Sequence, residues 1–373
     1  MNTLSPNKTH CGNSHNHNNK SDSRLSTVKN QLTSSLCHKK QPKRVLITGA
    51  CGNIGYAITF MIAQGRMFGH EQPLILHLFD LPNMKEGLRG LKMEVMDGAF
   101  PLVKGIVATS DPKEGFKDVD YALLCGARPR SKGMERKDLL SLNGKIFEEQ
   151  GKYFNQYSNK NVKVCVVGNP ANTNCLVLIK NAPDINPNNF TALTRLDHNR
   201  MLAQISEKTK ESDVNKFKNC IIWGNHSSTQ YPNIDYGVIE SIDDNNNTVA
   251  LPLVPYINDK QWIENEFIKT VQQRGAKVIE ARKLSSAASA ASAACDHMRD
   301  WILGTNDNTW VSMAVYSKGE YGAAKDLVFS YPVTCKNGEW KIVEGLKLSD
   351  FSKQKIKETS NELEEEKRLA LGK

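Results

Sequence analysis

The chain has 373 residues, of which 39% are hydrophobic, and a formal net charge of +9 at pH 7. It is long enough for two domains or one large one, and no apolar run approaches the roughly 20 residues that cross a bilayer, so we do not expect a membrane protein. The positive charge does not indicate a nucleic-acid-binding protein. Six basic residues against one acid, Asp22, give the first forty residues a net charge of +5, and no basic stripe interleaved with stacking aromatic residues follows.

The nine cysteines occur singly, with no Cys-x-x-Cys pair. This usage is typical of a reducing compartment, and it predicts no metal site. Cys51 allows two interpretations, because it lies in a glycine-rich turn before an expected helix. The positive end of that helix could lower the pKa of the thiol and make it oxidisable. The simpler interpretation, which we favour, is a small residue that fills a tight turn.

Residues 1–42 are rich in Asn, Ser, His and Lys and poor in large apolar side chains. We therefore expect a disordered leader with a targeting role. Within it, Arg24-Leu25-x5-Gln31-Leu32 resembles the N-terminal signal that an import receptor reads for delivery to the peroxisome. Two alternatives stay open: a disordered tail of a cytoplasmic protein, and a mitochondrial presequence, which is also basic, Ser-rich and poor in acids. A helix here would carry one apolar stripe, formed by Leu25, Val28, Leu32 and Leu36.

Apolar strand-like runs alternate with helical patterns over residues 43–190. Such alternation predicts a Rossmann-type, doubly wound parallel sheet in an α/β domain. The expected strands are 44–48, 74–80, 105–109, 121–125 and 162–167, and the expected helices are 55–66, 86–97, 136–158 and 173–180.

The pattern changes over residues 191–373, where shorter strands and long helices indicate a second, mixed α+β catalytic domain. We expect the first of these shorter strands to begin at residue 190, next to the predicted boundary between the two domains. The strands are expected at 190–194, 220–223, 236–242, 248–253, 327–334 and 340–343, and the helices at 259–282, 286–301 and 350–370.

The stretch from Arg44 to Tyr56 is an apolar run that ends in Gly49-x-x-Gly52-x-x-Gly55. It is typical of a strand, a phosphate-binding loop and the start of a helix, whose unpaired N–H groups and positive dipole end attract an anion. Its spacing departs from Gly-x-Gly-x-x-Gly, so a tight turn without a ligand is the alternative. Asp80, at the end of the next strand, stands where a dinucleotide site needs an acid for the ribose hydroxyls, and it favours NAD over NADP.

Arginines gather in the loop after the expected strand at 121–125, where Arg128, Arg130 and Arg136 alternate with Pro and Gly. Ligands of open α/β sheets bind at this carboxyl edge, and a guanidinium group pairs with a carboxylate through two hydrogen bonds. Gly133 could be the hinge of a closing lid. The alternative is a solvated basic loop.

Polar residues also follow other strands. Asn169 precedes a proline and could either contact a ligand or form an Asn-Pro turn. Asp197 and Arg200 would share a helix face, and His226 follows an apolar strand. A carboxylate beside an imidazole fixes its tautomer and makes it a proton shuttle near neutral pH, although a histidine in such a turn is more often structural.

Together these residues resemble the lactate/malate dehydrogenase family, in its cytosolic-type branch, from about Arg44 to near the C-terminus. Five motifs carry the resemblance and occur in the family's order. They are Thr48-Gly-Ala-Cys-Gly-Asn-Ile-Gly55, Gly133-Met-Glu-Arg-Lys-Asp-Leu-Leu140, Val167-Gly-Asn-Pro-Ala-Asn-Thr-Asn174, Leu193-Thr-Arg-Leu-Asp-His-Asn-Arg200 and Ile222-Trp-Gly-Asn-His-Ser-Ser-Thr-Gln-Tyr-Pro232.

The resemblance implies an NAD-dependent oxidoreductase that interconverts malate and oxaloacetate, usually a homodimer. It implies that His226 is the proton acceptor and donor and that Asp197 orients it. Arg200 would bind the carboxylate beside the reacting carbon, Arg136 would polarise the carbonyl, and Arg130 would pair with the far carboxylate. Asn169 would approach both substrate and cofactor. The implied NAD contacts are Gly49, Ala50, Cys51, Gly52, Asn53, Ile54, Gly55, Asp80, Asn143, Gln150, Val167, Gly168 and Asn169.

One departure from the family is Leu284, which stands where many members have a glycine before the pair Ser285-Ser286, and it could alter the substrate pocket slightly. The glycine loop also resembles that of short-chain reductases and nucleotide-sugar epimerases, which need a Tyr-x-x-x-Lys pair. Two such pairs exist, Tyr256 with Lys260 and Tyr321 with Lys325, but both lie far beyond the expected strands. An NAD-binding sensor on the same fold is a further alternative, and it would be expected to lack His226 or an arginine.

Overall fold

The computed structural model describes residues 40–128, 136–243 and 245–372, and at residues 136 and 137 it describes the backbone alone. The chain divides into two units, Met1–Gln41 and Pro42–Lys373. The leader signal that we expect lies outside the described residues, so the fold concerns the second unit. In that part of the chain, no helix is both long enough and apolar enough to cross a membrane.

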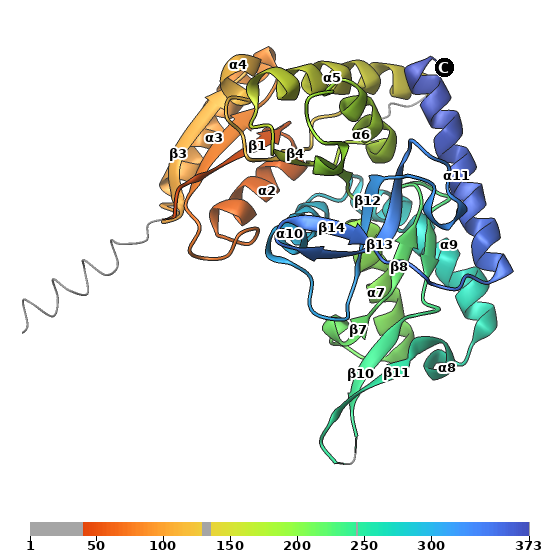
Figure 1. The fold of residues 1–373 in the computed structure, drawn as a ribbon. Helices are drawn as coiled ribbons and strands as arrows, with labels where there is room; N and C mark the ends of the chain where they lie inside the picture. The colour runs from red at the N-terminus through yellow and green to blue at the C-terminus, as the bar shows by residue number, and fades with distance from the viewer. Residues whose placement is uncertain (1–39, 129–135, 244, 373) are drawn as a thin grey trace, which may run out of the picture. The chain divides into compact units, whose positions relative to one another are not determined.

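A nine-stranded sheet runs through this unit in the order β14-β13-β12-β6-β5-β4-β1-β2-β3 (Figure 1). The six strands from β6 to β3 pair in parallel, which confirms the doubly wound fold. These strands are β1 (Lys43–Thr48), β2 (Leu74–Phe79), β3 (Val103–Thr109), β4 (Tyr121–Leu124), β5 (Lys163–Val166) and β6 (Phe190–Ala192).

Three antiparallel strands extend the same sheet: β12 (Val311–Tyr316), β13 (Val328–Lys336) and β14 (Glu339–Ile342). Two features differ from the sequence prediction. The strand expected at the start of the second domain is β6, the sixth parallel strand, and it falls on the boundary predicted at residues 190 and 191. That domain boundary stays a prediction. The strand β12 was not predicted, because buried Ser312 interrupts its apolar run.

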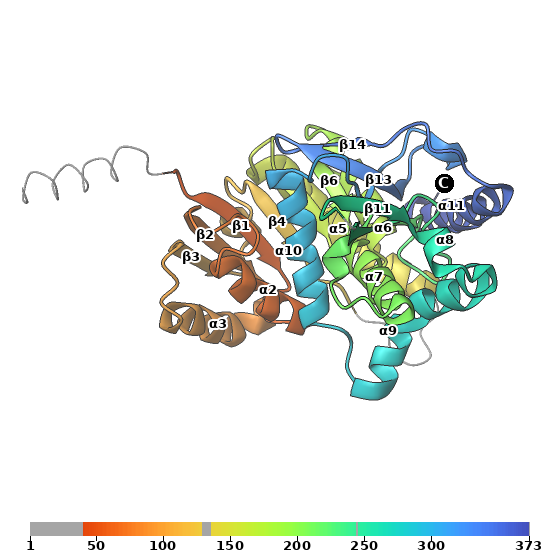
Figure 2. The same ribbon diagram turned by 90° about the horizontal axis from the view of Figure 1, so that it is seen from below.

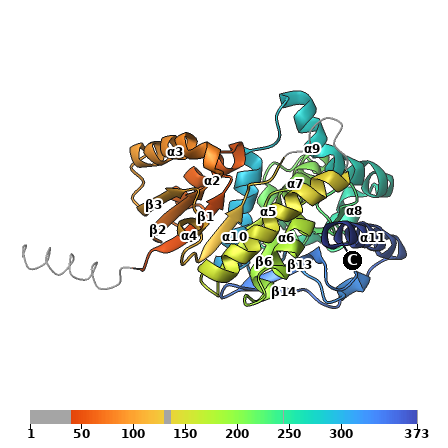
Figure 3. The ribbon, with the colours of Figure 1, turned by 90° about the horizontal axis from the view of Figure 1, so that it is seen from above.

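Helices cover both faces of the parallel sheet, which explains why its strands are nearly continuous apolar runs. On one face α2 (Asn53–Ala63) and α10 (Ala288–Leu303) lie side by side (Figure 2). On the other face α5 lies against α6, and α11 (Asp350–Leu371) packs beside both (Figure 3). The helices that precede β6 are α2 (Asn53–Ala63), α3 (Lys85–Asp97), α4 (Pro112–Gly115), α5 (Arg136–Tyr157) and α6 (Ala171–Lys180), with 3₁₀ turns at Pro82–Met84 and Pro187–Asn189.

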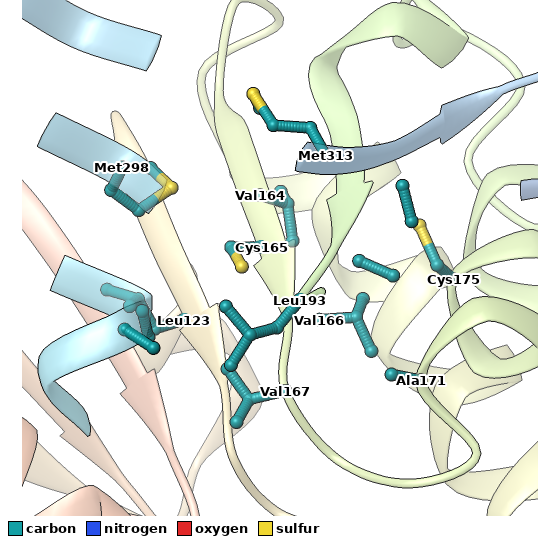
Figure 4. Close-up of a cluster of buried hydrophobic side chains, with 14 of the residues drawn as sticks. Leu123, Val164, Cys165, Val166, Val167, Ala171, Cys175, Leu193, Met298 and Met313 are labelled. Atoms are coloured by element: carbon teal, nitrogen blue, oxygen red, sulfur yellow. The ribbon is translucent and has the colours of Figure 1, made fainter. Parts of the chain in front are cut away.

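The core around β5 shows how alternate side chains serve the two layers (Figure 4). Cys165 points towards Met298 of α10, whereas Val166 points towards Ala171 and Cys175 of α6. All five of these side chains are almost fully buried. Because successive residues of a strand face opposite sides, this short strand anchors both helical layers.

The remaining elements build the second half of the unit. The helix expected at 259–282 is interrupted near its start by a π-helical turn at Trp262–Phe267. A hairpin of β10 and β11 extends away from the large sheet (Figure 1). The elements are α7 (Arg195–Thr209), β7 (Phe217–Lys218), β8 (Ile221–Trp223), β9 (Tyr231–Asn233), β10 (Val238–Ile242), β11 (Thr248–Pro252), α8 (Leu253–Ile257), α9 (Ile268–Arg282), α10 (Ala288–Leu303) and α11 (Asp350–Leu371), with 3₁₀ turns at Val214–Lys216 and Glu320–Gly322.

Candidate active site

The glycine loop between β1 and α2 has little room for side chains. Gly49 adopts a φ of +64°, and a Cβ atom there would lie 2.6 Å from Cα of Gly126. At Gly55 a Cβ atom would lie 2.2 Å from the carbonyl oxygen of Gly49. These two glycines are therefore required by the close approach of the loop to its own backbone and to the end of β4.

The loop fits the pyrophosphate and ribose of a dinucleotide. Helix α2 begins after Gly52, and no side chain caps its N-terminus, so its first N–H groups face out of the helix without an intrahelical acceptor. Asp80 lies beside the loop, since its carboxylate accepts hydrogen bonds from the backbone N–H of Cys51 at 2.9 Å and of Leu81 at 2.8 Å. Gly52 and Asn53 are exposed and Ile54 is half-buried, whereas the Ala50 side chain is fully buried and offers a ligand only its backbone.

The Cys51 thiol does not have the character of a reactive thiolate. Burial, together with the negative charge and hydrogen bond of Asp80, raises its pKa to about 11. The structure therefore favours the interpretation of Cys51 as a small residue in a tight turn.

The other predicted cofactor residues lie in α5 and after β5. Asn143 is fully buried, and its amide binds the backbone of Arg128 and Asn169 on the two neighbouring loops. Gln150 is buried too, and its Oε1 has no hydrogen-bond partner among the residues that the structure describes. Asn169 is exposed, beside the buried Val167 and Gly168.

His226 and Asp197 meet although they are 29 residues apart. The ring nitrogen Nδ1 of His226 hydrogen-bonds to Oδ2 of Asp197. Asp197 lies in the first turn of α7 and is fully buried, whereas the His226 side chain is 20% exposed. The contact orients the imidazole and leaves its other nitrogen, Nε2, for a ligand.

The two groups shift each other's pKa in opposite directions. Burial opposes both charged forms and is the largest single influence on each. The charge and hydrogen bond of Asp197 outweigh it at His226, so the pKa of His226 is raised. The charges of His226 and Arg200 lower the pKa of Asp197. The pair therefore favours a charged imidazole beside an ionised carboxylate.

Arg200 completes this cluster from one turn further along α7. Its Nη1 lies 3.2 Å from Oδ1 of Asp197, and its Nη2 donates to Oγ of Ser286 at 3.3 Å. The side chain packs over Gly275 of α9, where a Cβ atom would come within 3.5 Å of the guanidinium group. The guanidinium cation is thus held at a fixed place beside the carboxylate that also binds His226.

One positioning residue was missed in the sequence. Asn172 is fully buried at the start of α6, and its Oδ1 accepts the backbone N–H of His226 at 3.0 Å. Its Nδ2 donates to the carbonyl oxygens of Gly224 at 3.2 Å and Val328 at 2.9 Å. It belongs to the motif Val167–Asn174, whose spacing could have indicated a role for this second asparagine.

The structure does not describe the side chains of two of the predicted arginines. Arg130 lies outside the described residues, and at Arg136 the structure describes the backbone alone, at the first position of α5. Over the described ranges, no group of three or more His, Cys, Asp and Glu side chains could hold a metal ion.

Neither Tyr-x-x-x-Lys pair lies on the parallel sheet. Tyr256 is 48% exposed on α8. Tyr321 lies in a 3₁₀ turn, and its hydroxyl donates to the carbonyl oxygen of Val343. Both positions argue against the short-chain reductase alternative.

Comparisons with known proteins cover almost all of the described chain. A family model for the lactate/malate dehydrogenase NAD binding domain matches residues 43–191, and one for the lactate/malate dehydrogenase alpha/beta C-terminal domain matches residues 194–372. The chain is 53% identical over 331 residues to a protein of Zea mays named cytoplasmic malate dehydrogenase, a match that covers 89% of this chain and 98% of that protein. The identity to cytoplasmic malate dehydrogenase 1 of Arabidopsis thaliana is 52%, with the same coverage.

Solved structures of malate and lactate dehydrogenases have the same fold as this chain. The crystal structure of malate dehydrogenase from Naegleria fowleri matches with a TM-score of 0.84 and 45% identity, over 90% of this chain and 99% of that one. Lactate dehydrogenase of Trichomonas vaginalis, in complex with NADH and oxamate, matches with a TM-score of 0.83 and 36% identity, over 88% of this chain and 98% of that one.

Proposed function

Since the chain belongs to the lactate/malate dehydrogenase family, we propose that it is an NAD-dependent malate dehydrogenase. It would transfer a hydride reversibly between (S)-malate and NAD, giving oxaloacetate and NADH. The observation that carries the proposal is the imidazole of His226 held on the buried carboxylate of Asp197, with a guanidinium group 3.2 Å from that carboxylate. The relatives named malate dehydrogenase support the same reaction.

His226 moves the proton. In malate oxidation its Nε2 takes the proton of the substrate hydroxyl, and Asp197 stabilises the imidazolium that forms. In the reverse direction the imidazolium returns that proton to the oxygen of oxaloacetate. The glycine loop and Asp80 would hold NAD, which would accept the hydride that leaves the carbon bearing the hydroxyl.

The arginines would bind and orient the dicarboxylate. Arg200 lies beside Asp197, the partner of His226, and would pair with the carboxylate next to the reacting carbon. Arg136 would polarise the carbonyl oxygen, and Arg130 would pair with the far carboxylate. A monocarboxylate such as pyruvate would leave Arg130 without its partner, so this arginine would select dicarboxylates.

Replacement of His226 distinguishes a loss of proton transfer from a loss of cofactor binding. We expect His226→Asn to abolish turnover and to leave NADH affinity, measured by fluorescence titration, close to that of the parent protein. His70→Asn, at an exposed position remote in sequence from the motifs, is the matched control. Near-normal turnover of His226→Asn would remove His226 from the mechanism.

We also propose that the protein is a homodimer. Exposed apolar side chains on α2 and α3, namely Tyr56, Met93 and Met96, support a covered surface there. Light scattering should give twice the 41.6 kDa mass of one chain. A monomeric mass at micromolar concentration would contradict this assembly.

The leader motif supports import into the peroxisome, whereas relatives named cytoplasmic favour the alternative that the leader is a cytoplasmic tail. We propose that an import receptor reads Arg24-Leu25-x5-Gln31-Leu32. The full chain with a C-terminal fluorescent tag should give punctate signal, and Leu32→Ala should make it diffuse. Diffuse signal from the parent chain would point to the cytoplasm, and a tubular network would point to mitochondria.

A further inference from the structure

The loop that carries His226 joins β8 to β9 and lies against the C-terminal helix α11. Gly224 adopts a φ of +90°, and a Cβ atom there would lie 2.1 Å from the side chain of Thr359. The backbone N–H of Asn225 donates to Oγ1 of Thr359 at 2.9 Å. The start of the loop that carries His226 is therefore in direct contact with α11, a helix that contributes none of the predicted active-site residues.

Glu362, one turn further along α11, holds the residues on both sides of His226. Its Oε2 accepts a hydrogen bond from Nδ2 of Asn225 at 2.9 Å and another from the hydroxyl of Ser227. The hydroxyl of Thr229 lies 2.5 Å from the same oxygen. One carboxylate thus binds the side chains of the residues immediately before and after the proposed base.

Glu366, a further turn along, ties the same loop to α6. It is almost fully buried, and its Oε1 lies 3.0 Å from Nδ2 of Asn225. Its Oε2 accepts a hydrogen bond from the hydroxyl of Thr173. Thr173 follows Asn172, which accepts the backbone N–H of His226 at 3.0 Å. The loop is therefore held between α6 and α11 as well as by the ring contact with Asp197.

We propose that Glu362 and Glu366 are positioning residues, which set the orientation of the His226 ring towards Asp197 and the substrate. The inference deepens the proposed function and rests on it. Loops without such anchors are the mobile parts of a fold. Glu366 is buried and Glu362 is half-buried. Removing a carboxylate from water is costly unless it is hydrogen-bonded, so two hydrogen-bonded carboxylates at this place indicate a directional role rather than simple packing.

The test compares three variants of the full chain. Glu362→Ala removes the acceptor, Glu362→Gln keeps a carbonyl oxygen that can still accept, and Glu365→Ala is the control at an exposed position on the same helix. Turnover and KM with oxaloacetate, the pH profile of kcat/KM, NADH affinity and the melting temperature are measured for each variant and for the parent.

We expect Glu362→Ala to lower kcat by about tenfold, because a displacement of about 1 Å in a catalytic group can lower the rate up to about 100-fold. NADH affinity should not change. Oxaloacetate reduction needs a protonated His226, whose pKa Asp197 raises. A loosened contact lowers that pKa, so the basic limb of the profile should move to lower pH. Glu362→Gln should recover kcat to within about threefold, since a neutral hydrogen bond keeps roughly half the strength of a charged one.

An unchanged kcat and pH profile in Glu362→Ala, whatever its melting temperature, would overturn the inference and leave Glu362 a stabilising residue only. If Glu362→Ala does not fold, Ser227→Ala removes one of the same bonds without altering α11, and an unchanged profile there has the same meaning. Absence of turnover in the parent protein would instead contradict the proposed function.

Discussion

Asp197→Asn tests how far the buried carboxylate controls the base. Asp197 is fully buried between two donors, with Oδ2 on Nδ1 of His226 and Oδ1 at 3.2 Å from Nη1 of Arg200. Asparagine has the same shape without the charge, and its N–H₂ group faces either His226 or Arg200. If that group faces the imidazole, Nδ1 must accept, and the ring proton moves to Nε2. The nitrogen that should take the malate proton is then already protonated.

The structure sets the size of the effect. At 3.2 Å and an effective dielectric constant of about 20, the attraction between the Asp197 and Arg200 charges is about 5 kcal/mol before desolvation. Removing one partner of a buried pair typically destabilises a protein by about 3–5 kcal/mol, so the variant should fold with a lower melting temperature. Loss of the correct tautomer in other carboxylate–histidine pairs lowers turnover about 10⁴-fold, and we expect a loss of this order in malate oxidation.

The pH dependence has a definite sign. The pKa of His226 is raised above 6.5, so its contribution to stability is complete below pH 6.5 and is lost as pH rises through the folded-state pKa. The pKa of Asp197 is lowered below 3.8, so its contribution is complete above pH 3.8 and is lost as pH falls through the folded-state pKa. The difference in unfolding free energy between parent and variant should therefore be largest between pH 3.8 and 6.5.

Three measurements check this prediction: malate-dependent NAD reduction, NADH affinity, and the His226 pKa by NMR. The pKa should fall in Asp197→Asn, because burial and the positive charge of Arg200 both lower it once the carboxylate charge is gone. Turnover within tenfold of the parent, together with an unchanged His226 pKa, would show that Asp197 does not control the base.

Other substitutions test the binding groups. Gly55→Ala should weaken NADH binding at least tenfold, since its Cβ atom would lie 2.2 Å from the carbonyl oxygen of Gly49. The control Gly90→Ala on α3, whose Cβ atom would have no neighbour within 4 Å, should stabilise the protein by up to about 1 kcal/mol. Equal NADH affinities of the two variants would contradict this prediction. Arg130→Gln should reduce the preference for oxaloacetate over pyruvate about 10- to 100-fold, because a charge-assisted hydrogen bond contributes about 1.5–3 kcal/mol; an unchanged ratio of kcat/KM would remove Arg130 from substrate selection. Asp80→Ala should lower the NADH-to-NADPH ratio of kcat/KM about tenfold, equivalent to about 1.4 kcal/mol, and a constant ratio would show that another group excludes the ribose phosphate.

Much of the first half of the fold follows from local sequence, because buried parallel strands leave continuous apolar runs and the glycine loop has a fixed place between a strand and a helix. The local signal predicted a strand at 190–194, where β6 lies, but it failed to assign that strand to the parallel sheet, which β6 joins beside β5. It failed again at β12, where Ser312 is buried because its hydroxyl accepts the backbone N–H of Ile222 and lies 2.8 Å from Nδ1 of His198. When the hydrogen-bond partners of a polar residue lie far away in the chain, local sequence does not predict that the residue is buried.

The candidate site shows the same limit. His226 and Asp197 could be paired by family motif, and the structure brings them together. Asn143 was predicted as a cofactor contact, and the structure shows its amide engaged with backbone of two loops. Glu362 and Glu366 lie in an acidic run that is typical of a solvated helix face, and only the packing of α11 reveals that their partners are more than 130 residues away.

Steady-state oxidation of NADH by the full chain, with oxaloacetate as substrate and pyruvate as the comparison, tests whether the protein is a malate dehydrogenase. We predict rapid turnover with oxaloacetate and a kcat/KM for pyruvate lower by orders of magnitude. Equal or faster turnover of pyruvate, or no turnover of either substrate by protein that binds NADH, would contradict it.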